Sequence, residues 1–287
     1  MAVFPRNNAL YTNPPGASEQ LSTQGSSWLF AVTAIFGVAL LINLTLTALS
    51  STPGKRHIHH LLTPPLFTAL LTYYASASDL AWSPIVQSTA LSHSVGPTRQ
   101  IFWAKYILWS VAFPTVTALL GFVGRVPWST VGYQVVVGWV WVLSLLVAGF
   151  TGSLYKWGFF GFGLVAEGVL AWGTLFPSPA PGNTSGGVRR GEYLALAGAV
   201  NFLWVLYPLA WGLTDGGNYL GVTPGFIWFG ILDLLLVVGV GFAVAGLAGK
   251  WDDKALGFAS TSQQQQQQAG VLEKETGGPV NGGEASV

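Results

Sequence analysis

The sequence predicts an all-α membrane protein built as a bundle of seven transmembrane helices. Of its 287 residues, 51% are hydrophobic and only 8% are charged, whereas soluble domains carry roughly 25% charged residues. An apolar helix of about 20 residues crosses the hydrocarbon core of a bilayer. Seven segments meet this length, at about 28–50, 58–80, 101–123, 129–151, 154–176, 192–213 and 223–247.

The flanking segments and the basic residues predict the organisation of the chain. Residues 1–27 are polar, have no short apolar stretch typical of a signal peptide, and are expected to form an extracellular tail. Residues 28–248 form the seven-helix domain, and the Gln-rich segment 249–287 is expected to be a disordered cytoplasmic tail. Basic residues gather on the cytoplasmic side of membranes. The richer side would hold Lys55, Arg56, Arg125, Arg189, Arg190, Lys250 and Lys254, and the poorer side Arg6, Arg99, Lys105 and Lys156. The N-terminus is therefore expected outside the cell.

The last apolar segment contains one charged residue, Asp233. A carboxylate in hydrocarbon costs several kcal/mol unless it finds partners, so Asp233 is expected to face the bundle interior. Tyr73 and Tyr207 are suitable donors. Two interpretations stay open at this point. Asp233 either serves a ligand cavity or residual proton site, or it keeps three helices in register.

Aromatic residues at regular spacing predict the surroundings of this acid. Trp204, Tyr207 and Trp211 recur every three or four residues, which places them on one face of a helix. Together with Tyr73 and Asp233 they are expected to wall an aromatic, partly polar cavity.

Three motifs in order resemble the microbial (type 1) rhodopsins. They are W-x-K-Y-x-x-W-x-x-x-x-P from Trp103, W-x-x-Y-P-x-x-W from Trp204, and L-D-x-x-x-x-V-G-x-G from Leu232. The resemblance implies a microbial-rhodopsin-like, opsin-like domain over residues 28–248. It further implies that Trp109, Trp204 and Tyr207 enclose the retinal site, with Tyr73, Tyr207 and Asp233 as the remainder of the counterion complex.

The departures from the family pattern bear on activity. In microbial rhodopsins a lysine one turn after the aspartate binds retinal, and here that position is Val237. Where proton pumps carry acceptor and donor carboxylates, this chain has Leu108 and Leu119. We therefore expect no covalent retinal and no proton pumping. The same loss and the Gln-rich tail are similar to fungal opsin-related proteins of the plasma membrane, the group of the heat-shock protein of about 30 kDa.

Two further ionisable residues complete the predicted polar network. Lys105 stands where the family usually has an arginine, and it is expected either to pair with Asp233 or to extend to the lipid headgroups. Glu167 is expected to point toward the ring end of the retinal space, where it would favour a polar ligand. Its alternative is a protonated side chain bonded to a neighbouring helix.

Other site classes find little support in the sequence. His57, His59 and His60 lack a partnering acid or cysteine, so we expect no metal site and instead a basic segment that meets anionic lipid. No catalytic motif is present, and an enzyme is not expected. The net charge of +1, with scattered basic residues, gives no reason to expect a nucleic-acid partner.

The resemblance implies a stress-associated or chaperone-like protein of the plasma membrane. One alternative is a sensor or carrier that holds a retinoid, isoprenoid or lipid noncovalently in the aromatic cavity. A second alternative is a light-independent proton or ion channel. Membrane lipid is the expected partner, and a homo-oligomer is compatible with the sequence.

Overall fold

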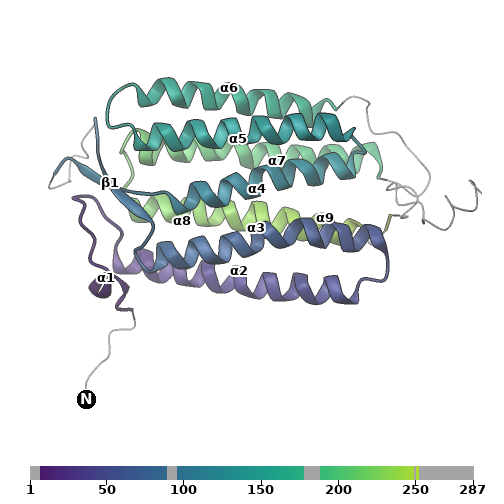
Figure 1. The fold of residues 1–287 in the computed structure, drawn as a ribbon, viewed down its shortest axis with the longest axis horizontal. Coiled ribbons are helices and arrows are strands. Elements are labelled where there is room, and N and C mark those ends of the chain that lie inside the picture. The colour runs from purple at the N-terminus through teal and green to yellow at the C-terminus, as the bar shows by residue number, and fades with distance from the viewer. Residues whose placement is uncertain (1–6, 89–95, 178–187, 249, 252–287) are drawn as a thin grey trace, which may run out of the picture.

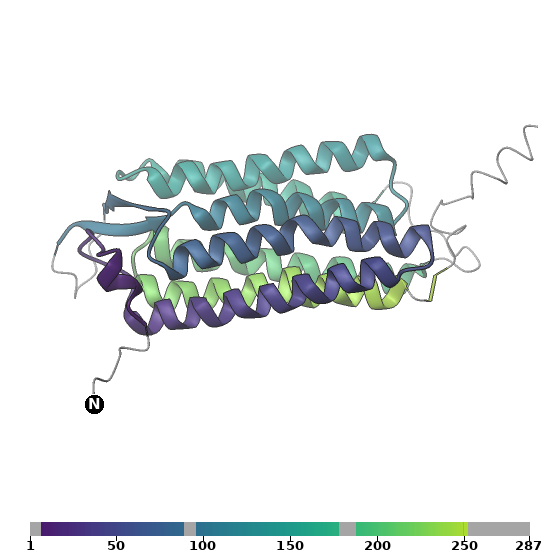
Figure 2. The same cartoon turned by 60° about the horizontal axis from the view of Figure 1, so that its bottom comes forward.

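The computed structural model describes residues 7–88, 96–177, 188–248 and 250–251, and it shows the predicted bundle (Figures 1 and 2). The spanning helices are α2 (Thr23–Leu49), α3 (Pro53–Ala77), α4 (Ala104–Val123), α5 (Trp128–Phe150), α6 (Lys156–Leu175), α7 (Arg190–Trp211) and α8 (Val222–Asp233). The π-helical turn η1 (Gly212–Gly216) extends α7, while η2 (Leu234–Val240) and α9 (Gly241–Ala248) extend α8. Each predicted segment corresponds to one of these helices.

Six of the described helices are both long and apolar enough to cross a membrane. The remaining long helix, α3, has 25 residues, which is a length of about 37 Å. Its first turns are basic, which lowers its mean hydropathy without shortening it. The chain therefore crosses the membrane seven times, and the described part of it begins and ends at opposite ends of the bundle (Figure 1).

Neighbouring helices along the chain pack side by side, and the last span closes the bundle. α2 packs against α3, α3 against α4, α4 against α5, and α5 against α6. α8 then lies between α7 and α2, and α9 contacts α3. This closure brings the carboxyl end of α8 against helices from both halves of the chain, so that Asp233 faces the interior.

A two-stranded hairpin, which the sequence analysis did not predict, covers one end of the bundle. β1 (Trp82–Val86) pairs antiparallel with β2 (Thr98–Phe102), so that Pro84 lies opposite Gln100. Beyond β1, Gln87 accepts a hydrogen bond of 3.0 Å from Lys156 Nζ at the start of α6. The short strands and Pro84 conceal the hairpin in the sequence, because proline is depleted from strands. We call this the hairpin end of the bundle.

The N-terminal segment is part of the fold rather than a free tail. It carries the short helix α1 (Ala9–Thr12) and then adds to the hairpin, where the Glu19 N–H donates to the Thr98 carbonyl and the Gln100 N–H donates to the Glu19 carbonyl, both at 2.9 Å. Helix α2 then begins at Thr23 because Ser22 caps it, its hydroxyl accepting from the Gly25 N–H. The expected boundary at residue 28 is therefore too late.

Gln100 joins three segments at the hairpin end. Its side-chain oxygen accepts from the Leu21 N–H at 2.8 Å, and its nitrogen donates to Asp79 Oδ1 at 2.7 Å. Asp79 follows α3 at a positive φ of 56°, and its Oδ2 is buried without a partner. Burial raises the pKa of the Asp79 carboxyl, against the opposing influence of Gln100.

Asp79→Asn should flatten the pH dependence of stability. A raised pKa means that the folded protein binds the proton more tightly than the unfolded chain does, so stability falls as pH rises above the ordinary value of 3.8. Asn cannot titrate, yet it still offers an acceptor to Gln100. Melting temperatures of the detergent-solubilised proteins across pH 3–8 test this, and parallel curves for wild type and variant would contradict it.

Candidate functional site in the bundle interior

Asp233 is the centre of a hydrogen-bonded group that links four helices. Its side chain is 1% exposed. Tyr73 of α3 donates to Oδ2 at 2.6 Å, and Tyr207 of α7 donates to Oδ1 at 2.7 Å. These contacts agree with the expected tyrosine donors. A third donor, the indole N–H of Trp109 on α4, reaches Oδ1 at 3.1 Å. The sequence suggested Trp109 only as a wall, although an indole always carries a donor.

Lys105 pairs with Asp215 and not with Asp233. Its ammonium forms an ion pair with Asp215 Oδ2, and it lies 4.7 Å from the ring centroid of Phe229. The side chain is 7% exposed, so it does not extend to the headgroups either. Both expected roles of Lys105 are therefore wrong. The sequence analysis did not single out Asp215, which lies in η1 and is only 4% exposed.

Asp215 collects further partners at the hairpin end. Tyr106 donates to Oδ2 at 3.0 Å and itself accepts from Trp211 Nε1 at 2.8 Å. Arg99 Nε lies 3.6 Å from Oδ1, so two cations face one carboxylate. The sequence analysis did not predict this group of charges. The one signal for it was that Arg99 and Lys105 lie on the side of the membrane with fewer basic residues.

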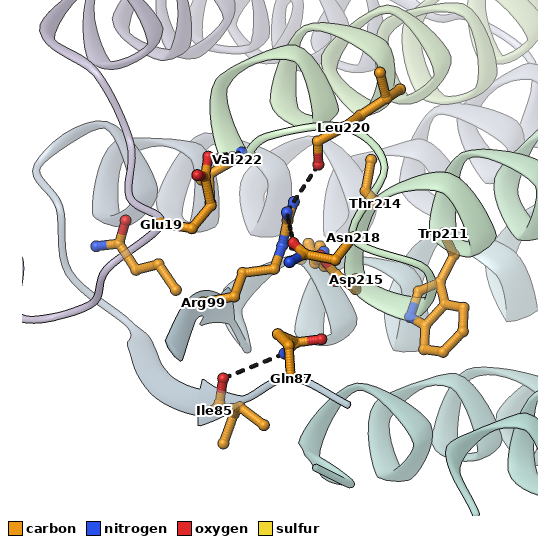
Figure 3. Close-up of polar contacts among 12 residues, drawn as sticks. Glu19, Ile85, Gln87, Arg99, Trp211, Thr214, Asp215, Asn218, Leu220 and Val222 are labelled. Atoms are coloured by element: carbon orange, nitrogen blue, oxygen red, sulfur yellow. Dashed lines mark hydrogen bonds and ion pairs between the residues drawn. The ribbon is translucent and has the colours of Figure 1, made fainter. Parts of the chain in front are cut away.

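Arg99 holds the turn after η1 in place (Figure 3). Its Nη1 donates to Asn218 Oδ1 at 2.7 Å and to the Leu220 carbonyl at 2.8 Å. Burial lowers the pKa of the Arg99 guanidinium, while the negative charges of Asp215 and Glu19 act in the opposite direction. Two buried cations therefore lie beside Asp215, Arg99 from the strand β2 and Lys105 from the helix α4.

The aromatic residues pack against one another and against two rings that the sequence analysis missed. Phe113 stacks on Trp141 with ring centroids 4.6 Å apart. It also lies 4.9 Å from Tyr207, 5.9 Å from Trp109 and 6.2 Å from Trp204. All five side chains are fully buried. Phe113 therefore packs against all three residues that were expected to enclose a ligand, Trp109, Trp204 and Tyr207.

Trp211 belongs to a different group of rings than Trp204. Its ring stacks on Phe160 at 5.1 Å and its indole N–H serves the Asp215 network. The shared helical face predicted for Trp204, Tyr207 and Trp211 thus runs from the aromatic core to the hairpin end. Along this face, Tyr207 belongs to the Asp233 network and Trp211 belongs to the Asp215 network.

The remaining predicted positions are buried. Val237 is 2% exposed and lies in η2, four residues after Asp233. Leu108 and Leu119 on α4 are 0% and 1% exposed. Glu167 on α6 is 6% exposed. None of the hydrogen bonds or ion pairs of the described residues involves its carboxyl.

The histidine segment behaves differently from the prediction at one position. His59 is 6% exposed, and its Nδ1 lies 2.8 Å from Asn43 Oδ1. Asn43 also donates to the His59 carbonyl at 3.0 Å, so His59 fastens α2 to α3 instead of meeting lipid. Within the described residues there is no group of three acidic, histidine or cysteine ligands that could hold a metal.

A family model described as bacteriorhodopsin-like protein matches residues 23–251, which include every spanning helix and both carboxylate networks. The chain belongs to the bacteriorhodopsin-like family. This membership accounts for the seven-helix architecture and for the position of Asp233 among aromatic donors, and it makes the chain an integral membrane protein.

Relatives and solved structures agree with this membership. Protein FDD123 of Trametes versicolor is 35% identical, covering 90% of this chain and 93% of its own. Opsin-like protein carO of Fusarium fujikuroi is 32% identical over 80% of this chain and 77% of its own. The 30 kDa heat shock protein of Saccharomyces cerevisiae is 31% identical over 80% and 74%.

Among solved structures, the light-driven proton pump of Leptosphaeria maculans superposes with a TM-score of 0.73 at 25% identity, covering 80% of this chain and 96% of that one. Acetabularia rhodopsin I gives a TM-score of 0.70 at 27% identity, covering 83% and 100%. Both likenesses extend over the whole bundle.

Asp233→Ala should destabilise the protein more than Asp233→Asn. Alanine leaves Tyr73, Tyr207 and Trp109 without their acceptor, at about 1–3 kcal/mol for each unpaired group, whereas Asn retains one acceptor oxygen. Thermal unfolding in detergent measures both variants. Equal melting temperatures would show that these hydrogen bonds contribute little.

Asp215→Asn should cost more stability than Lys105→Met. The first change leaves Lys105 and Arg99 as buried cations without a counterion, and breaking such a pair costs about 3–5 kcal/mol. The second change leaves Asp215 with Arg99 and Tyr106. Unfolding free energies of the two variants give the comparison, and the reverse order would mean that Arg99 does not stabilise Asp215.

Proposed function

We propose that this protein is a non-photochemical member of its family, without covalent retinal, proton pumping or catalytic activity. The observation that carries the proposal is Val237, one turn after Asp233. A covalent bond to the retinal aldehyde requires a primary amine, and valine has none. Residues 190–248, which form the last two spans, contain no lysine.

The two buried lysines of the described bundle have other partners. Lys105 is paired with Asp215, and Lys156 donates to Gln87. Both lie at the hairpin end and not beside Val237. This arrangement supports the absence of a covalent chromophore site.

Proton transfer through the bundle lacks the groups it would need. Transfer along a helix relies on titratable side chains at suitable intervals, and α4 offers the buried side chains of Leu108 and Leu119 instead. Asp233 already accepts three hydrogen bonds from neutral donors. These features support a structural role for Asp233, and they weigh against the ion-channel alternative.

The packed aromatic core weighs against a carrier of a large apolar ligand. Phe113 packs against four other buried rings, those of Trp109, Trp141, Trp204 and Tyr207, so a polyene or sterol that entered between them would have to displace it. This packing weighs against retinal in the same way. The noncovalent ligand role is accordingly the weaker proposal.

The cellular role that we propose is that of a stress-associated or chaperone-like protein of the plasma membrane, with the N-terminus outside and the C-terminus in the cytoplasm. Its support is the 31% identity to the 30 kDa heat shock protein of Saccharomyces cerevisiae, together with a bundle held by internal polar networks. Expression of the chain in a yeast strain that lacks that protein tests this role. Survival after heat shock should rise above that of the strain with empty vector, and unchanged survival would contradict the stress role alone.

Incubation with all-trans retinal should give no visible absorption band, and borohydride reduction should leave no retinyl adduct on the wild-type protein. Val237→Lys supplies the missing amine, but Phe113 still fills the core. We therefore expect little adduct from this single variant and a clear adduct only when Phe113→Ala is added, because removal of the ring opens a cavity. Reduction followed by peptide mass spectrometry measures both. If Val237→Lys alone gives as much adduct as the double variant, the core admits retinal without the removal of the Phe113 ring.

A further inference from the structure

An apolar groove opens on the outer surface of the bundle, where α2 meets the last span. It has a volume of about 460 Å³ and is lined by five side chains of α2 between residues 34 and 42, together with Val238 of η2 and Phe242 of α9. Ile35, Val38 and Ile42 in its wall expose 46%, 57% and 48% of their surface. All seven lining side chains are apolar, so the groove suits a hydrocarbon occupant.

The size of the groove distinguishes between two apolar occupants. Its α2 wall is about 12 Å long. A helix from a second copy is about 10 Å across, so a length of 12 Å displaces about 900 Å³, which is about twice the volume of the groove. Such a helix would rest over the groove without filling it, whereas a single acyl chain can lie inside.

The groove lies at the depth of the acyl chains of one leaflet. α2 has 27 residues, so it is about 40 Å long and extends beyond a hydrocarbon core of about 30 Å. Residues 34–42 lie about 10–22 Å from its last residue, Leu49. They are therefore mostly in the half of the bilayer at the end of the bundle away from the hairpin (Figure 1).

A basic residue stands at this same end of each wall of the groove. On one side, Arg56 Nη2 donates to the carbonyl of Ser50, the residue that caps α2, at 2.9 Å. On the other side, Lys250 follows α9, and its side chain is exposed. Ile42 precedes Ser50 by eight residues, and Phe242 precedes Lys250 by eight, so each cation stands about 12 Å beyond the groove. We call this the basic end of the bundle.

The charge at the basic end favours an anionic group. Lys55, Arg125, Arg189 and Arg190 lie at this end as well. Of the acids that the structure describes, only Glu192 is found there, and Arg189 forms an ion pair with it. A phosphate at the basic end would therefore meet several cations, and none of the described acids there is unpaired.

We propose that an anionic phospholipid occupies this site, with one acyl chain in the groove and its headgroup at Arg56 and Lys250. A guanidinium carries five N–H donors, and one bond to Ser50 leaves others for a phosphate. Basic residues at the membrane surface attract anionic lipids. The site is separate from the networks around Asp233 and Asp215, so it does not depend on the proposed function.

A lipid titration tests the role of the two cations. The full chain in detergent is titrated with phosphatidylserine or with phosphatidylcholine, and native mass spectrometry gives the dissociation constant of the first bound lipid. Phosphatidylserine should bind more tightly. Arg56→Gln and Lys250→Gln should each weaken its binding about fivefold, and together about 30-fold, with phosphatidylcholine unaffected. Equal affinity for the two lipids, or no loss in the double variant, would overturn the proposal.

Ala34→Phe tests the groove itself. Ala34 lines the groove and is exposed, so a phenyl ring there fills the groove without entering the core. This variant should lose the first bound phosphatidylserine at lipid concentrations that saturate the wild type. Unchanged binding would overturn the proposal. A protein dimer that Ala34→Phe abolishes would assign the groove to a second copy, which would overturn it as well.

Two matched variants control for general effects of size and charge. Ala195→Phe makes the same change at an exposed position on α7, which does not line the groove. Arg125→Gln removes an exposed cation from the basic end, beyond α4. Both should bind phosphatidylserine as the wild type does. Weaker binding in either control would mean that the bundle surface attracts lipid without this site, and it would overturn the assignment.

Discussion

A carboxylate within a membrane-spanning helix must find donors inside the bundle, and the arrangement of the core depends on how Asp233 does so. Its two oxygens accept from Tyr73, Tyr207 and Trp109, which belong to three different helices. Each of these helices must keep its height and rotation relative to α8 for the bonds to form. Asp233 therefore fixes the relative positions of α3, α4, α7 and α8.

The second buried carboxylate is satisfied by a different chemistry. Asp215 receives the cations Arg99 and Lys105, whereas the donors to Asp233 are all neutral. Both cations are held at the hairpin end, and the Lys105 ammonium also lies over the rings of Phe229 and Trp109, 4.7 Å and 5.9 Å from their centroids. A buried ion pair by itself adds little stability but specifies geometry, and here it ties β2 and α4 to the end of α7.

The sequence was sufficient for the seven helices and for the tyrosine donors, because apolar segment length and an isolated acid are local signals. It could not locate Asp215, since a turn sequence gave no sign that η1 carries it inward. Phe113 and Trp141 escaped notice for a related reason. In a helix that is apolar all round, spacing does not tell which ring points to the centre and which to lipid. The hairpin was hidden because its pairing is between residues far apart in the sequence.

The attachment of the N-terminal segment to the hairpin has a practical consequence. Glu19 bridges Arg99, so the outer edge of β2 is paired instead of presenting free N–H and carbonyl groups. Uncovered strand edges are templates for association between molecules. A recombinant chain that begins after Glu19 would expose that edge beside a membrane surface, where copies meet in two dimensions. Aggregation of such a truncated product would then reflect the lost edge cover and not a defect of the helical bundle.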